Sequence, residues 1–214
     1  MHVQISLVEA SAYGALRPAL EDVYMCMEGA HSDTRRYQQQ LRLLARVTPE
    51  RLGLPPPFCV RSPNPAPPPY TDAIQCLRSL PQATTPDRGL QCLVDVCRLV
   101  SEGAVAMGAP PLAADQLVPL IAFVCITSRL ASLTVELALL QDLATDAQLS
   151  GESGYCLATF QVSACWHKHT YAHTCIHTYI HTYIHTCMPR HLPGVGPLAL
   201  RVAMGRTPLS DPII

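Results

Sequence analysis

The sequence predicts an all-α fold, an irregular layered helical bundle with a proline-rich loop and a disordered C-terminal tail. Apolar residues recur at helical spacing through much of the first 164 residues, and helix-start signals precede several of these runs. Strand-like alternation is scarce before residue 165. Hydrophobic residues make up 49% of the 214 residues, which is enough apolar material for one buried core.

Two sets of apolar residues predict two helices in the first fifty residues. The sets are Leu16, Leu20, Val23 and Met27, followed by Leu41, Leu44 and Val47. Residues 28–36 (EGAHSDTRR) lie between them, and we expect these residues to supply a turn and caps. Thr48 followed by Pro49 is typical of a further helix start, because proline fits the first helical position.

Residues 55–70 (PPPFCVRSPNPAPPPY) hold eight of the chain's 20 prolines. Proline lacks an N–H group and clashes with the preceding turn, so this segment cannot be a helix interior. We expect a solvated loop with some polyproline character. A docking segment for a partner domain with an aromatic groove is the alternative.

Helices are predicted to resume at residue 70. In the segment 84–107, Thr85 is a predicted N-cap, Pro86 fits the first turn and Asp87 favours the positive end of the helix dipole. Residues 109–130 are the most apolar and predict a central helix. The expected inward residues are Ile74, Leu77, Leu80, Leu90, Leu93, Val94, Cys97, Val100, Leu133, Leu137 and Leu140, with Glu136 and Asp142 outward. Residues 150–154 predict a turn, and a last helix follows it.

Composition excludes several classes of function. The net charge of −1 argues against nucleic acid, whose phosphates need a surface rich in lysine and arginine. The sequence has no Cys-x-x-Cys pair, so we expect reduced thiols in a cytoplasmic protein. The N-terminus lacks the pattern of a secretory signal, and residues 117–126, the longest apolar run, are too short to span a bilayer. We therefore expect no direct membrane insertion.

A histidine falls at every fourth position from His169 to His185. Imidazoles at this spacing share one helical face and can bind a metal, with His173, His177 and His181 as weak candidates. The repeated unit His-Thr-Tyr-Ile is poor helix material, and no acidic residue stands in the repeat to orient an imidazole. Since CAC ACA TAC ATA encodes this unit, we interpret the repeat as translated simple-sequence DNA that begins a foreign, disordered tail over residues 165–214.

Three stretches together resemble a known family. They are TPDRGLQCLVDVCRLV (85–100), AADQLVPLIAFV (113–124) and GESGYCLATFQVSA (151–164). Their order and separation are similar to the core of the vacuolar-protein-sorting-nine (Vps-nine) domain, with an alsin-like or Ras-and-Rab-interactor-like parent. The resemblance implies a helical exchange domain over residues 15–164, after a lead-in of residues 1–14.

The resemblance also implies site residues. Asp115 would capture the lysine of a GTPase phosphate-binding loop, and Pro119, four positions later, would belong to the docking surface. Gly154 and Tyr155 correspond to the family's second motif, in which the tyrosine packs on the GTPase switch surface. The family's contacting threonine three positions later is replaced here by Ala158, with Thr159 one place on.

Each of these residues also has a plainer interpretation. An aspartate such as Asp115 is often a helix N-cap or a first-turn charge. Pro119 could mark the true start of its helix. Tyr155 could be an ordinary residue at the edge of the core.

The resemblance implies a guanine nucleotide exchange factor for an endosomal Rab GTPase of the Rab-five class. Such a protein is a GTPase regulator rather than an enzyme of covalent chemistry, and it needs no cofactor. Partners would recruit it to endosomal membranes. The alternatives are a protein without exchange activity, disabled by Ala158 and by a last helix shortened near Ala164, and, less favoured, a metal-binding protein.

Overall fold

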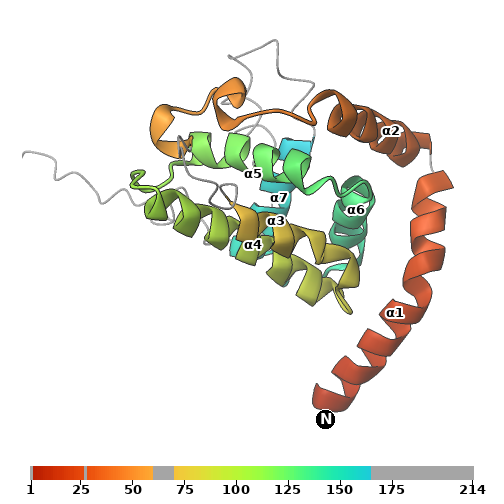
Figure 1. Ribbon diagram of the computed structural model, residues 1–214. Helices are drawn as coiled ribbons and strands as arrows, with labels where there is room; N and C mark the ends of the chain where they lie inside the picture. Colours follow the sequence, from red (N-terminus) through yellow and green to blue (C-terminus); the bar gives the residue numbers. More distant parts are fainter. Residues whose placement is uncertain (1, 27, 60–69, 165–214) are drawn as a thin grey trace, which may run out of the picture. The chain divides into compact units, whose positions relative to one another are not determined.

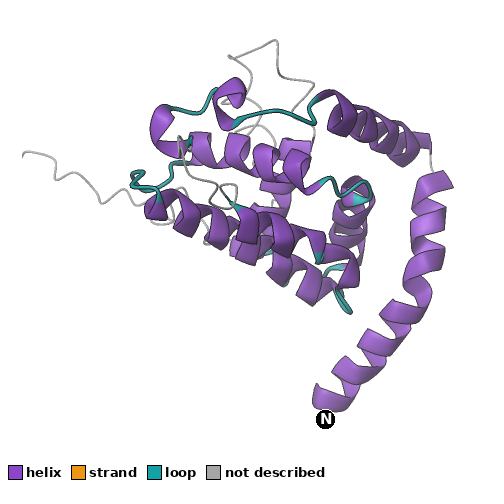
Figure 2. Ribbon diagram, viewed as in Figure 1, coloured by secondary structure: helices purple, strands orange, loops and turns teal. Residues whose placement is uncertain are grey.

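The computed structural model describes residues 2–26, 28–59 and 70–164, and these residues form an all-helical structure without strands (Figures 1 and 2). The α-helices are α1 (His2–Cys26), α2 (Glu28–Leu43), α3 (Thr71–Arg78), α4 (Pro86–Ala106), α5 (Ala114–Ser128), α6 (Leu133–Leu143) and α7 (Glu152–Ala164). Short 3-10 turns are η1 (Pro49–Leu52), η2 (Pro56–Phe58) and η3 (Leu80–Gln82). The all-α prediction is confirmed. The histidine repeat and the predicted tail lie outside the described residues.

The core is built around α7, which packs against α4, α5 and α6, while α3 packs against α4 and α5 (Figure 1). Side chains from three of these helices are fully buried at the centre, namely Leu93, Val96, Val100, Ile121 and Phe160. Burying each such side chain stabilises a fold by roughly 1.5–3 kcal/mol. Helix α7 is therefore the central packing element.

Most of the predicted inward faces are confirmed. Ile74, Leu77 and Leu80 are buried, and so are Leu133, Leu137 and Leu140 on α6. The predicted start of α4 is also confirmed, because the Thr85 hydroxyl accepts a hydrogen bond from the backbone N–H of Arg88 at 3.2 Å.

Two predictions in the first fifty residues are wrong. Residues 28–36 do not form a turn but the first part of α2. Helix α1 is a helix as predicted, but its expected apolar face is exposed, with Leu16 at 58% and Val23 at 57% exposure. The side of α1 that carries Arg17 and Tyr24, roughly a quarter turn round the helix, makes the contacts instead.

Arg17 joins α1 to the rest of the fold. Its guanidinium forms a buried ion pair with Glu136 of α6 and donates a hydrogen bond to the Ala83 carbonyl oxygen at 2.9 Å. One helical turn away, Glu21 accepts a second bond from Arg17 at 2.8 Å. The prediction that Glu136 points outward is wrong. Glu136 is buried because it forms the ion pair with Arg17.

The proline-rich segment enters the core only after Pro55, Pro56 and Pro57, which are exposed. Phe58 is 1% exposed and Cys59 is buried beside it. The Tyr70 hydroxyl donates a hydrogen bond to the Phe58 carbonyl oxygen at 3.1 Å and so fixes the start of the segment to its end. The expectation of a solvated loop is therefore wrong for residues 58 and 59, while residues 60–69 lie outside the described part.

Candidate functional site

Asp115 lies in the first turn of α5, two positions after the N-cap Ala113. The side-chain oxygen of Gln116 accepts a hydrogen bond from the Ala113 backbone N–H at 3.1 Å and so closes this helix start. The helix begins at Ala114, so the alternative that Pro119 marks the start is excluded. Asp115 is a first-turn residue, as the plainer interpretation also expects.

Pro119 lies inside α5 and is buried. It has no N–H group, so the Asp115 carbonyl oxygen receives no helical hydrogen bond from the residue four positions later. The turn that carries Asp115 is therefore held less tightly than the rest of α5. Since Pro119 is buried, its ring shapes this turn rather than presenting an open surface.

The other end of α5 is held by three hydrogen bonds to its last carbonyl groups. The Tyr37 hydroxyl donates to the Cys125 carbonyl oxygen at 3.2 Å, and the Ser128 hydroxyl donates to the same oxygen at 2.8 Å. Arg78 donates from Nε to the Ser128 carbonyl oxygen at 2.9 Å. These bonds anchor α5 at the end away from Asp115 and fix where its first turn stands.

The first turn of α7 depends on the absence of a side chain at Gly154. A Cβ atom at this position would lie 1.8 Å from the Leu149 carbonyl oxygen, far inside contact distance. The preceding turn reverses at Gly151, whose φ of 72° suits glycine. The sequence singled out Gly154 for GTPase binding, and the structure adds a packing reason that has no signal in the sequence.

Tyr155 is half-buried at the start of α7 and packs against the core. Burial raises the pKa of its hydroxyl, so the ring is neutral at physiological pH. One face of the residue remains accessible. Tyr155 thus combines a core contact with an exposed edge, which fits both of its interpretations.

Ala158 and Thr159 differ in where the helix places them. Ala158 is half-buried and follows Tyr155 by three positions, so the two residues share one side of α7. Thr159 is 5% exposed, and its hydroxyl donates a hydrogen bond to the Tyr155 carbonyl oxygen at 2.8 Å. The Thr159 hydroxyl is therefore used within the helix and does not replace the one that Ala158 lacks.

Helix α7 crosses from α4 to α5 and separates the two halves of the site. The first half of α7 packs against α4. At this contact the pKa of the Cys97 thiol is raised, mainly by a hydrogen bond with Cys156 and also by burial. The last turn of α7 meets the first half of α5, where the Ser163 hydroxyl donates to the Val118 carbonyl oxygen at 3.1 Å. Tyr155 precedes Ser163 by about 12 Å of helix, so the turn of Asp115 and Tyr155 lie at different ends of α7.

The metal candidates His173, His177 and His181 lie outside the described residues. No described helix is both long enough and apolar enough to cross a membrane. Sequence reasoning missed an open pocket of about 380 Å³ that involves Arg42 and Arg129 and does not include the residues above. The signal available for it was the run of arginines between residues 35 and 46.

Part of the chain is similar to a known protein family and to two human proteins. Residues 70–169 match the family described as the vacuolar sorting protein 9 (VPS9) domain. The human protein named VPS9 domain-containing protein 1 is 27% identical over 175 residues, which cover 73% of this chain and 27% of that protein. Human Ras and Rab interactor 3 is 28% identical over 161 residues, which cover 72% of this chain and 16% of that protein. The chain therefore spans less than a third of the length of either relative.

Proposed function

Because residues 70–169 match the VPS9 domain family, we propose that this chain is a guanine nucleotide exchange factor for a Rab GTPase. The finer proposal is a GTPase of the Rab-five class, in endocytic vesicle traffic. One relative is named as a Ras and Rab interactor, which is consistent with a small GTPase as partner. The chain would act as a regulator, and the nucleotide and Mg²⁺ would belong to the GTPase.

The placement of Asp115 carries this proposal. It stands in the first turn of α5, and its own backbone carbonyl oxygen lacks a helical hydrogen bond because Pro119 has no N–H group. In the proposed mechanism its carboxylate captures the lysine of the GTPase phosphate-binding loop. That lysine otherwise neutralises the nucleotide phosphates, so the captured state favours an empty GTPase and promotes release of GDP.

Tyr155 supplies the second point of contact. An aromatic side chain with one face packed on its own core and one edge exposed is a rigid anchor for a partner surface. Gly154 allows the close approach of the Leu149 carbonyl group and so sets the position of this ring. The GTPase would be held at both ends of α7, with its switch region against Tyr155.

Ala158 favours a second candidate, a domain of the same fold with little exchange activity. The position shares a side of α7 with Tyr155 but offers no hydroxyl, and Thr159 is turned into the helix. Under this candidate the chain binds a Rab GTPase without accelerating release of its nucleotide. In both cases we propose a cytoplasmic protein that partners recruit to endosomal membranes.

Release of a fluorescent GDP analogue from a panel of Rab GTPases tests both candidates. The full chain should accelerate release from Rab-five-class members, and Asp115→Ala should abolish the effect. Asp87→Ala is the matched control, because Asp87 also occupies the second position of its helix. Binding without acceleration would support the second candidate, and no binding would contradict both.

A further inference from the structure

The exposed side of α2 is strongly basic. Its inward side is formed by Thr34, Tyr37 and Leu41, all buried. The outward side and the turn after it carry four exposed arginines, namely Arg35, Arg36, Arg42 and Arg46. Leu43 stands among them with 75% exposure, the highest of the large apolar side chains in the described part of the chain. The exposed side therefore combines positive charge with one apolar residue facing water.

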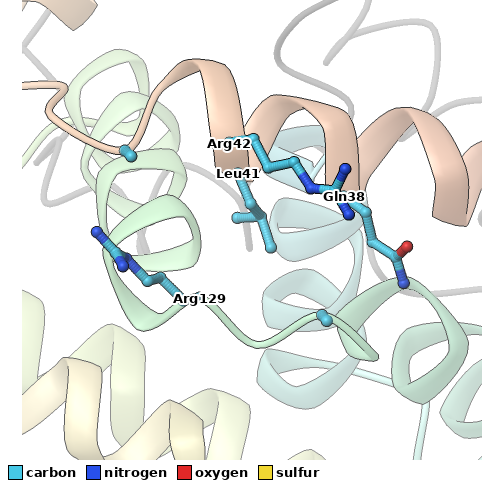
Figure 3. A pocket seen from close by; sticks show the side chains of 6 residues that line it. Gln38, Leu41, Arg42 and Arg129 are labelled. Carbon is cyan, nitrogen blue, oxygen red and sulfur yellow. The ribbon is translucent and has the colours of Figure 1, made fainter.

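An open pocket of about 380 Å³ adjoins this side (Figure 3). It lies between the end of α2 and the turn that joins α5 to α6, and it is lined by Gln38, Leu41, Arg42, Ala45, Arg129 and Ala131. Arg42 extends along α2 towards Gln38, whereas Arg129 comes from the turn and points away from Arg42 (Figure 3). The pocket thus adds a fifth arginine, Arg129, which lines it together with Arg42.

Arg42 and Arg129 are available for an external anion, whereas Arg36 pairs with the exposed Asp33 at 3.8 Å. Neither Arg42 nor Arg129 forms an ion pair or a side-chain hydrogen bond with another described residue. Arg129 also has a φ of 55°, the left-handed conformation that normally falls to glycine or asparagine at the end of a helix. A charged, unpaired side chain at such a position is not explained by the stability of the fold.

We propose that this arginine face, Arg35, Arg36, Arg42, Arg46 and Arg129 with Leu43, binds the surface of an anionic membrane through lipid phosphate groups. The guanidinium groups of Arg42 and Arg129 point apart and do not converge on one anion. That geometry fits a surface with many phosphates better than a single bound phosphate. Leu43 lies in the headgroup region, as apolar residues beside arginines do in interfacial helices.

The arginine face leaves the proposed GTPase site accessible. Arg129 follows the last residue of α5, whereas Asp115 lies in its first turn, so about 21 Å of helix separates the two residues. The chain can therefore contact a membrane and a membrane-attached partner at the same time. This contact adds to recruitment by partners and does not depend on exchange activity.

Cosedimentation of the full chain with lipid vesicles tests the proposal. The chain should pellet with phosphatidylcholine vesicles that contain phosphatidylserine and not with vesicles of phosphatidylcholine alone, and added salt should release it. Arg42→Ala and Arg129→Ala should each weaken binding about fivefold, the contribution of one basic residue at an anionic surface. Leu43→Ser should weaken binding without changing its dependence on salt.

Arg88→Ala is the control, because Arg88 is an exposed arginine on α4 and its loss changes the net charge equally. Equal weakening by Arg88→Ala and Arg42→Ala would overturn the proposal, as would equal binding to both kinds of vesicle. Tight binding of an acidic peptide that Leu43→Ser leaves unchanged would assign the face to a protein partner instead. The replaced side chains are exposed and unpaired, so melting temperatures should stay constant and confirm that each variant is folded.

Discussion

Arg17 and Glu136 stand 119 residues apart in the chain and form a buried ion pair between α1 and α6. Helix α6 lies within the match to the VPS9 domain, which begins at residue 70, and α1 lies before it. The pair therefore ties an N-terminal helix to the region that matches the VPS9 domain. A second link runs alongside it, in which the Tyr24 hydroxyl donates a hydrogen bond to Asp142.

Replacing Arg17 with methionine should strongly destabilise the protein. Removal of one partner leaves an uncompensated buried carboxylate, which costs about 3–5 kcal/mol of unfolding free energy. Urea unfolding followed by circular dichroism measures this loss. The double variant Arg17→Met with Glu136→Leu should recover most of it, because two apolar side chains replace the pair. An Arg17→Met variant as stable as the parent would show that the pair contributes nothing.

The loss of stability caused by Arg17→Met should depend on pH. Burial raises the pKa of Glu136, while Arg17 acts in the opposite direction. A raised pKa means that the folded state binds the proton more tightly than the unfolded state. The contribution of this group to stability is therefore greatest at low pH and falls as pH rises through the folded pKa. Without Arg17 the pKa should rise further, so Arg17→Met should be closer to the parent at acidic pH than at neutral pH. Equal destabilisation at both pH values would contradict this assignment.

Gly154→Ala should destabilise the first turn of α7. The new methyl group would meet the Leu149 carbonyl oxygen, and a backbone shift of this kind costs roughly 1–3 kcal/mol. Gly14→Ala is the matched control, because a Cβ there has no neighbour within 4 Å and alanine is the better helix residue. Thermal melting should show a loss for Gly154→Ala and no loss for Gly14→Ala. Equal melting temperatures for Gly154→Ala and the parent would contradict the packing role.

Ala158→Thr should increase nucleotide exchange. The substitution places a hydroxyl on the side of α7 that carries Tyr155. One added hydrogen bond contributes about 0.5–1.5 kcal/mol, which corresponds to a rise of about two- to tenfold in the exchange rate. Thr159→Val is the comparison, since the Thr159 hydroxyl bonds within the helix and its loss should leave exchange unchanged. The reverse result would show that Thr159 performs the contact.

Much of the fold follows from local patterns in the sequence. Thr85, Pro86 and the apolar residues after them define α4 because capping and helical periodicity act within a few residues. The packing of α1 does not follow from such patterns. Its apolar residues Leu16 and Val23 predict a buried face, but the distant Glu136 selects the side with Arg17. A long-range ion pair leaves no trace in local periodicity.

Part of the candidate site could likewise be predicted from the sequence, and part could not. Asp115 and Tyr155 were identified from motifs, and the structure places both in the first turns of their helices. The role of Gly154 against Leu149 required coordinates, because the contact comes from a turn that the motif does not include. The arginine face also required coordinates. Arg129 is far from α2 in the sequence, and only the fold brings both to one pocket.

The rate of GDP release from a Rab-five-class GTPase, with Asp115→Ala compared with Asp87→Ala, tests the central claim most directly. We predict that the full chain accelerates release and that Asp115→Ala reduces the acceleration by at least about thirtyfold. Removing one partner of a buried charge pair at an interface costs about 2–5 kcal/mol, and the lower end of this range corresponds to about thirtyfold. Asp87→Ala should retain the full rate. A folded chain that does not accelerate release, or one in which both variants behave alike, would contradict the role of Asp115 in exchange.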